Sequence, residues 1–155
     1  MAAFDYRQAK EIRDVFGLHQ VRYLFLGKSG AILLGFPDTT QDADVFVERS
    51  GKNGEALVRA LRQLGFALTE AQAGEINLGK DFVQLKNGPF DLDLVFAPDG
   101  IERFEDAWGR RVDVEGYPVC HIDDIIASKE AANRQKDRES LPRLRSFREY
   151  WLQHH

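Results

Sequence analysis

The segment FDLDLVFA at residues 90–97 constrains the fold of this chain more than any other feature. Every second residue in it is large and apolar, which is the period of a β-strand with one face in a hydrophobic core. The opposite face begins with two aspartates, Asp91 and Asp93. The sequence therefore predicts a strand that turns one side to the core and presents carboxylates on the other.

A second pair of aspartates lies at the start of another expected strand, ADVFVE (43–48). Residues two apart on a strand point to the same side, so Asp42 and Asp44 would repel each other unless a cation lies between them. Hard oxygen ligands favour Mg²⁺ or Mn²⁺. An isolated pair of this kind is more often a turn residue beside a water-facing one. Two such strands side by side, however, would form a carboxylate cage suited to metal-assisted phosphoryl transfer.

The remaining segments mix strands in hairpins with strands that alternate with helices. This mixture favours an α+β or mixed α/β domain over a regular doubly wound sheet. Further strands are expected at 21–27, 66–70, 75–79 and 81–87, with turns at 50–54 and 87–89 and a hairpin around Gly116. Helices are expected at 4–16, 30–35, 55–66, 100–108, 124–135 and 137–153, the fifth of them capped by Asp123.

Length and composition favour one globular domain, residues 1–155. A chain of 155 residues suits one core, which we expect at about 20–121, followed by C-terminal helices at about 122–153. No apolar run approaches the roughly 20 residues that span a bilayer, so no membrane partner is expected. The single cysteine, Cys120, cannot form an internal disulfide, which fits a reducing compartment and predicts a cytoplasmic protein.

The charge is unevenly distributed along the chain. The net charge of −4 argues against a protein that coats nucleic acid. Residues 129–148 nevertheless contain seven basic and three acidic side chains, a net charge of +4 that leaves −8 for the rest. This stretch fits a solvated helix face or a surface that faces phosphate, and the two interpretations do not exclude each other.

The glycine-rich segment GKSG (27–30) follows an expected strand and precedes a short helix. Backbone amides in such a turn can hold a phosphate, and Lys28 and Ser29 would add a charge and a hydroxyl. A P-loop is excluded, because that motif needs a glycine five residues before Gly27, where this chain has Arg22. Taken alone, the segment is most simply a strand-to-helix turn.

The order of these pieces resembles the nucleotidyltransferase superfamily, which includes DNA polymerase beta and small stand-alone bacterial proteins of minimal or antitoxin type. The superfamily pattern is a strand, a Gly-Gly or Gly-Ser turn, a short helix, a loop and DxD on the next strand. A third aspartate follows on a later strand. Residues 24–48 have this layout. The residues on marked positions of the bacterial branch are Gly27, Gly35, Thr40, Asp42 and Asp44.

The second half of the chain resembles the same branch, so that the resemblance covers about 20–145. The distance from FDLDLVFA to Gly100 favours Asp93 as the third carboxylate, with Asp91 as the alternative. The segment IDDIIASKEAANRQKDRESLPRL is similar to a pair of helices in the branch. The residues on its marked positions are Lys129, Arg134, Lys136 and Asp137.

Two residues depart from the pattern of that branch. Lys28 replaces the second glycine or serine of the phosphate turn, although Ser29 follows at once. Asp38 stands where the branch usually has an arginine before the TxD segment. A lysine can neutralise a triphosphate, whereas an added carboxylate repels one. These departures bear on catalytic competence and not on the fold.

The resemblance implies a nucleotidyltransferase fold, with a mixed central sheet flanked by helices. It also implies transfer of a nucleoside monophosphate from a nucleoside triphosphate to an acceptor hydroxyl, with ATP among the candidate nucleotides. Asp42, Asp44 and Asp93 would bind Mg²⁺ or Mn²⁺ and carry the catalysis, with Asp91 as the alternative metal ligand. The implied nucleotide-binding residues are Gly27, Lys28, Ser29, Thr40, Lys129 and Arg134.

The sequence leaves the acceptor open among RNA, protein and small molecules. An open cleft in so short a chain is compatible with a homodimer. A second hypothesis is a catalytically degenerate nucleotidyltransferase that acts as a binding or antitoxin-type partner, as in toxin–antitoxin systems, because the chain lacks the added domains that select substrates in larger relatives. A metal-dependent phosphohydrolase is a weaker third interpretation, since no residue pattern here requires a water-activating site.

Overall fold

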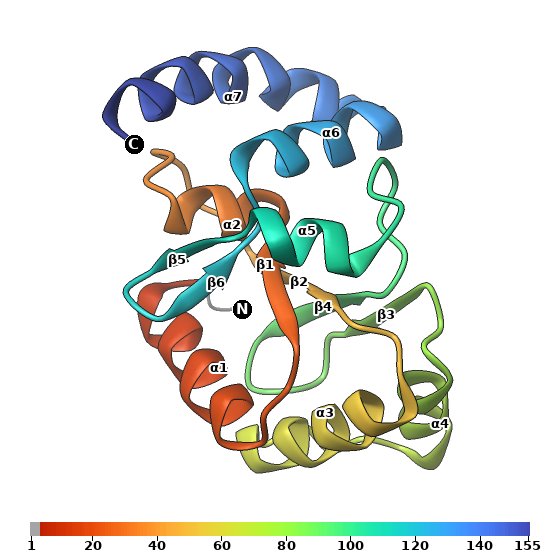
Figure 1. Cartoon of the computed structure of the whole chain (residues 1–155). Helices are drawn as coiled ribbons and strands as arrows, with labels where there is room; N and C mark the ends of the chain where they lie inside the picture. Colours follow the sequence, from red (N-terminus) through yellow and green to blue (C-terminus); the bar gives the residue numbers. More distant parts are fainter. Residues whose placement is uncertain (1–3) are drawn as a thin grey trace.

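A computed structural model describes residues 4–155 of the chain and is shown in Figure 1. Within these residues, six strands form one mixed sheet in the order β3-β4-β2-β1-β6-β5. Strand β2 pairs in parallel with β4 and antiparallel with β1, while β3 pairs antiparallel with β4. The strands are β1 (Tyr23–Leu26), β2 (Asp42–Val47), β3 (Phe82–Leu85), β4 (Asp91–Val95), β5 (Val112–Val114) and β6 (Tyr117–Val119).

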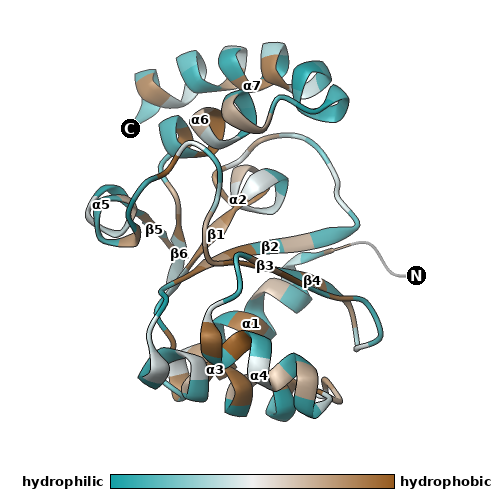
Figure 2. Cartoon of the chain, turned by 90° about the vertical axis from the view of Figure 1, so that its right-hand side faces the viewer, coloured by the Kyte–Doolittle hydropathy of each residue, from teal (hydrophilic) through white to brown (hydrophobic). Residues whose placement is uncertain are grey.

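The helices cover both faces of this sheet. One layer contains α1, α3 and α4, and the opposite side holds α2, α5, α6 and α7 (Figures 1 and 2). Helix α7 is the outermost, since it packs on α6, which in turn packs on α2. The helices are α1 (Tyr6–Leu18), α2 (Gly27–Leu33), α3 (Gly51–Leu64), α4 (Glu70–Leu78), α5 (Phe104–Arg110), α6 (Ile122–Ala132) and α7 (Gln135–His154).

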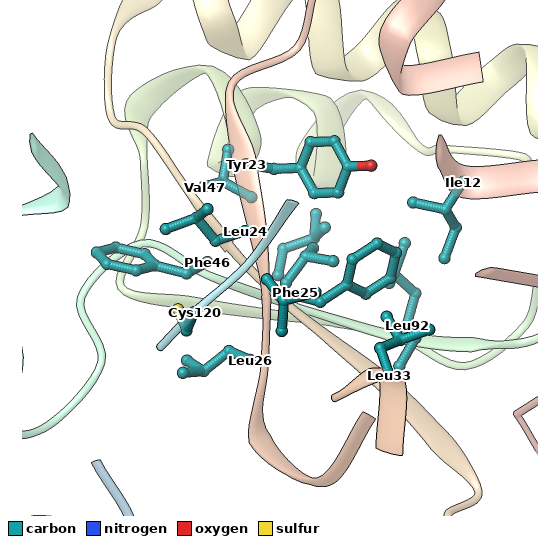
Figure 3. Packing of buried hydrophobic residues seen from close by; sticks show 14 of the residues in the cluster. Ile12, Tyr23, Leu24, Phe25, Leu26, Leu33, Phe46, Val47, Leu92 and Cys120 are labelled. Carbon is teal, nitrogen blue, oxygen red and sulfur yellow. The ribbon is translucent and has the colours of Figure 1, made fainter. Parts of the chain in front are cut away.

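Strand β1 lies at the centre of the core, because helices cover both of its faces. All four of its residues are buried. In Figure 3, Tyr23 and Phe25 point to one side of the strand, and Leu24 and Leu26 point to the other. Figure 2 shows apolar residues along the strands and a largely hydrophilic surface on α7. Burial on both faces explains why residues 23–26 of the expected strand form a continuous apolar run.

The prediction of strands at 66–70 and 75–79 is wrong. Residues 66–69 form a loop, and helix α4 follows it directly. Thr69 caps the helix: its hydroxyl accepts from the backbone N–H of Gln72, whose side chain accepts from the backbone N–H of Thr69. Gly79 ends the helix in the left-handed region, with a φ of 69°. These capping residues outweigh the local strand-like composition.

Further boundaries differ from those expected, among them the start of α5 at Phe104 instead of residue 100. The segment expected as a turn at 50–54 is the start of α3, because the Ser50 hydroxyl caps the helix on the backbone N–H of Asn53. Helix α2 begins directly at Gly27 instead of after the GKSG turn. The cap of α6 is His121, whose Nδ1 accepts from the backbone N–H of Asp123, the residue expected to be the cap. None of these differences changes the fold class, which is mixed α/β with C-terminal helices as expected.

Across residues 4–155, the structure contains no helix with the length and apolarity required to cross a membrane.

Candidate functional site

The two predicted aspartate pairs lie on neighbouring strands. Strands β2 and β4 are parallel, and their register pairs Asp42 with Asp91 and Asp44 with Asp93. The carboxylates therefore meet at one end of the two central strands. The carboxyl groups of Asp44 and Asp93 are close enough to share a hydrogen bond when one of them is protonated.

This crowding raises the pKa of both carboxyl groups. Burial, followed by the charge of Asp93, raises the pKa of Asp44 to about 8. Burial also raises the pKa of Asp93; the contact with the carboxyl group of Asp44 opposes this shift, and the charge of Asp42 adds to it. Like charges gathered in a poorly solvated place are costly unless a proton or a cation neutralises them. Either a proton or a bound cation would relieve this cost.

These carboxylates form part of the floor of a cleft of about 740 Å³ between the sheet and helices α6 and α7. The N-terminus of α2 and the loop before β2 form one wall, and the first turn of α7 contributes to another. Among the residues that line the cleft are eight of those expected from the sequence: Gly27, Lys28, Thr40, Asp42, Asp44, Asp93, Lys129 and Arg134.

Two candidate residues lie outside the lining of this cleft. The Ser29 hydroxyl is fully buried, where it donates to the Leu26 carbonyl at 2.9 Å and accepts from the Asp44 backbone N–H at 3.0 Å. Its position ties α2 to β2 and so supports Asp44 from behind. Asp91 is buried at the start of β4, away from the cleft, so the geometry favours Asp93 over Asp91 as the third carboxylate.

The basic wall of the cleft is organised around one buried carboxylate, Asp137, which has no exposed surface. Arg134 donates to it three times: from the backbone N–H at 3.1 Å, from Nε at 2.8 Å and from Nη2 at 3.3 Å. The Lys129 ammonium lies 3.6 Å from the same carboxylate. Burial alone would raise the pKa of Asp137, but the bonds from Arg134 hold it below its ordinary value. Asp137 thus fixes two cations at the edge of the cleft.

The two departures from the superfamily pattern pair with each other. The Lys28 ammonium lies 3.4 Å from the Asp38 carboxylate. Arg143, on α7, donates to the same carboxylate at 3.3 Å and to the Pro37 carbonyl at 3.0 Å. The carboxylate of Asp38 is therefore balanced by two cations, and its ion pairs fix the loop before β2 to α2 and α7.

Comparison with solved structures determines the fold. The lincomycin-bound crystal structure of the lincosamide antibiotic adenylyltransferase LnuA superposes with a TM-score of 0.65. The match covers 94% of this chain and 99% of that one, at 14% sequence identity. The chain has the nucleotidyltransferase fold. No model of a protein family and no curated protein sequence matches it.

The donor set of the nucleotidyltransferase fold suits a hard divalent cation. Asp42, Asp44 and Asp93 offer only carboxylate oxygens, and oxygen ligands are those that Mg²⁺ and Mn²⁺ prefer. The raised pKa values of Asp44 and Asp93 also fit a site that gains stability when a cation binds. Within residues 4–155, no group of three His, Cys, Asp or Glu side chains already has a metal-binding geometry.

Sequence reasoning missed two residues of the nucleotidyltransferase cleft, Phe82 and Gln84, both on β3. The signal was present, because the segment DFVQLKN alternates and puts these two residues on one face. Their position beside Asp93 depends on the register of β3 against β4, which the turn expected at 87–89 did not fix.

Gly27 lies where no side chain fits. Its φ is +62°, and an added Cβ would lie 2.3 Å from Oδ2 of Asp44. We expect Gly27→Ala to displace Asp44 and to destabilise the fold by about 2–3 kcal/mol through the left-handed backbone and the clash. Urea unfolding and the response to nucleotide with Mg²⁺ would measure both effects.

The matched control is Gly17→Ala on α1, since a Cβ there meets no atom within 4 Å. That variant should be neutral or more stable by about 0.5–1 kcal/mol, because alanine is favoured in a helix. Equal behaviour of the two variants would contradict the close fit of Gly27 against Asp44.

Proposed function

We propose that the chain is a metal-dependent nucleotidyltransferase that transfers a nucleoside monophosphate from a nucleoside triphosphate to an acceptor hydroxyl and releases pyrophosphate. The observation that carries this proposal is the meeting of Asp42, Asp44 and Asp93 on two parallel strands, opposite a basic wall in one cleft. Negative charge on the floor suits a cation, and positive charge on the wall suits a triphosphate.

The side chains of the cleft would have different roles in the reaction. Asp42 and Asp44 would hold the divalent cation, which supplies positive charge to the phosphates when bound. Lys28, Lys129 and Arg134 would neutralise the charge of the leaving pyrophosphate. Asp93, with its raised pKa, is suited to accept the proton of the acceptor hydroxyl or to complete the cation site.

The structural neighbour LnuA suggests the first nucleotide to test. It is an adenylyltransferase for lincosamide antibiotics, so ATP is the first candidate donor for this chain. The shared fold at 14% identity leaves the acceptor of this chain to be found by experiment.

A thermal unfolding titration with ATP, GTP, CTP and UTP, each with and without Mg²⁺, tests the proposal. A ligand at about 100 times its dissociation constant stabilises the folded state by about 2.7 kcal/mol, which raises the melting temperature of a domain of this size by about 5–10 °C. We expect such a rise with at least one nucleotide and only in the presence of Mg²⁺. Release of pyrophosphate from that nucleotide would then be followed during an acceptor screen.

The alternative is a catalytically degenerate protein that acts as a binding or antitoxin-type partner. The ion pair of Asp38 with Lys28 favours it, because this pair occupies the ammonium that would otherwise neutralise a triphosphate. No rise in melting temperature with any nucleotide would support this alternative and contradict the proposed activity.

A further inference from the structure

Strand β3 supplies the one aromatic side chain among the described residues that line the cleft, Phe82. Strand β3 is an edge strand, paired only with β4. Val83 and Leu85 point into the core and are 4% and 2% exposed, whereas Phe82 and Gln84 point to the cleft. Phe82 is 47% exposed. An exposed aromatic side chain on an edge strand is a liability for a protein, so its place in a cleft suggests a ligand contact.

The register of the sheet places this wall directly beside the proposed catalytic carboxylate. Gln84 pairs with Asp93 across β3 and β4, so the two side chains lie next to each other on the same face of the sheet. Phe82 pairs with Val95, which also lines the cleft. Across the sheet, the order is therefore Asp44 on β2, Asp93 on β4, and then Gln84 with Phe82 on β3.

The basic side chains that line the cleft come from α2, α6 and the start of α7, and strand β3 contributes none. They are Lys28, Lys129, Arg134 and Lys136. Beside β3 the cleft is lined by Asp81, which is paired with the guanidinium of Arg49 at 2.8 Å. Strand β3 therefore offers no unpaired cation to a polyanion, whereas its exposed ring suits a neutral or cationic molecule.

The geometry of phosphoryl transfer indicates which side of the cleft would hold the leaving group and which would hold the acceptor. The attacking and leaving oxygens lie roughly in line on opposite sides of the reacting phosphorus. If the leaving pyrophosphate lies toward Lys28, Lys129 and Arg134, the acceptor hydroxyl approaches from the opposite side, past Asp93. The opposite side is the wall that contains Gln84 and Phe82.

We propose that Phe82 is a specificity-determining residue for the acceptor, whose ring packs against an apolar ring face of a neutral or cationic small molecule while its hydroxyl reaches Asp93. This inference rests on the proposed function for the identity of the acceptor end. Among the candidate acceptors, this inference favours a small ring-containing alcohol over RNA or protein. Gln84 positions the carboxylate of Asp93 next to that alcohol.

Amide-resolved NMR of the ¹⁵N-labelled protein tests the assignment. The probes are ATP with Mg²⁺, phenyl β-D-glucopyranoside as a neutral ring-containing alcohol, and a hexamer of adenylate as a nucleic acid with a free 3′-hydroxyl. We expect the glucoside to shift the amides of residues 81–85 and 93–97, and ATP to shift those of 27–30, 39–44 and 129–136. The hexamer should not shift the amides of 81–85.

The variant Phe82→Ala should weaken binding of the glucoside at least about tenfold, since contacts of this kind with an aromatic side chain are worth that much. Phe82→Tyr should keep it, and neither variant should change the response to ATP. The control is Tyr150→Ala, which removes an exposed aromatic side chain of α7 outside this cleft and should change neither response.

The outcomes separate the two proposals. The inference is overturned if the glucoside does not bind, or if Phe82→Ala leaves its binding unchanged. It is also overturned if the adenine ring of ATP or the adenylate hexamer binds at Phe82. A glucoside response lost in Phe82→Ala, together with no response to ATP, would instead contradict the proposed function and leave a ring-binding site at β3.

Discussion

Asp44→Asn is expected to abolish the Mg²⁺-dependent response to nucleotide while leaving the metal-free protein as stable as the wild type or more so. The variant removes one anionic ligand, so the cation loses the oxygen that the parallel register places beside Asp93. Metal ions contribute several kcal/mol to the stabilisation of a phosphoryl transition state, and each 1.36 kcal/mol is a factor of ten in rate. We therefore expect the rate of pyrophosphate release to fall about a thousandfold.

The stability of the same variant has a definite pH dependence. The pKa of Asp44 is raised to about 8 in the folded protein, against an ordinary value of about 4 when the chain is unfolded. Between those two values the unfolded chain releases the proton and the folded chain keeps it, so the wild type loses stability as the pH rises from 4 to 8. Asparagine has no proton to lose. In the metal-free proteins, the free energy of unfolding of Asp44→Asn should therefore gain on that of the wild type from pH 5 to pH 8.

The matched control is Asp113→Asn on β5, whose side chain is 64% exposed and lies outside the cleft. It should leave both the nucleotide response and the pH dependence unchanged. A full nucleotide response in Asp44→Asn would contradict the metal-binding role of this carboxylate. A constant difference in unfolding free energy across the pH range would contradict its crowded environment.

The parts of the site that the sequence predicted are those that depend on local pattern. The two aspartate pairs were identified because a strand repeats every two residues, so each pair had to lie on one face. The choice of Asp93 over Asp91 came from the superfamily layout. Gly27 and Thr40 were identified through the superfamily layout. In each case the chemistry and the local structure are encoded within about ten residues of one another.

The parts that failed depend on partners far along the chain or on competing local signals. The sequence indicated that the carboxylate of Asp38 would repel a triphosphate. In the structure Lys28 and Arg143 both pair with this carboxylate, but Arg143 lies 105 residues beyond Asp38, so the sequence did not show the contact. Ser29 was expected to face a phosphate, and only the packing of α2 against β2 explains why its hydroxyl is buried. Helix α4 was missed although Thr69 and Gln72 have the spacing of a capping box, because the strand-like composition around them was given more weight.

Asp137→Asn is expected to weaken both the fold and the nucleotide site, because this carboxylate is the common partner of Arg134 and Lys129. Asp137 has no exposed surface, but the side chain of Arg134 is 59% exposed, so water compensates part of the charge that is left behind and the cost should be about 2–3 kcal/mol. For a domain of this size the melting temperature should fall by about 5–10 °C. The nucleotide response should fall as well, since both cations lose the group that holds them at the cleft.

A matched variant separates the two effects of Asp137→Asn. Asp124 on α6 is also buried and accepts from Arg110 at 2.9 and 3.0 Å, but it does not line the cleft. Asp124→Asn should lower the melting temperature without weakening nucleotide binding in the folded protein, measured by calorimetry well below the melting temperature. If it weakens nucleotide binding as much as Asp137→Asn does, Asp137 has no special role in positioning the two cations.

The pH dependence gives an independent measure of the charge on Asp137. Because the hydrogen bonds from Arg134 hold its folded-state pKa below the ordinary value of about 4, its charge stabilises the fold above that pH. The contribution is lost as the pH falls through the lowered pKa. The difference in unfolding free energy between the wild type and Asp137→Asn should therefore be largest near neutral pH and shrink below about pH 4. A difference that stays constant down to pH 3 would mean that the carboxylate supports the cleft through its shape and not through its charge.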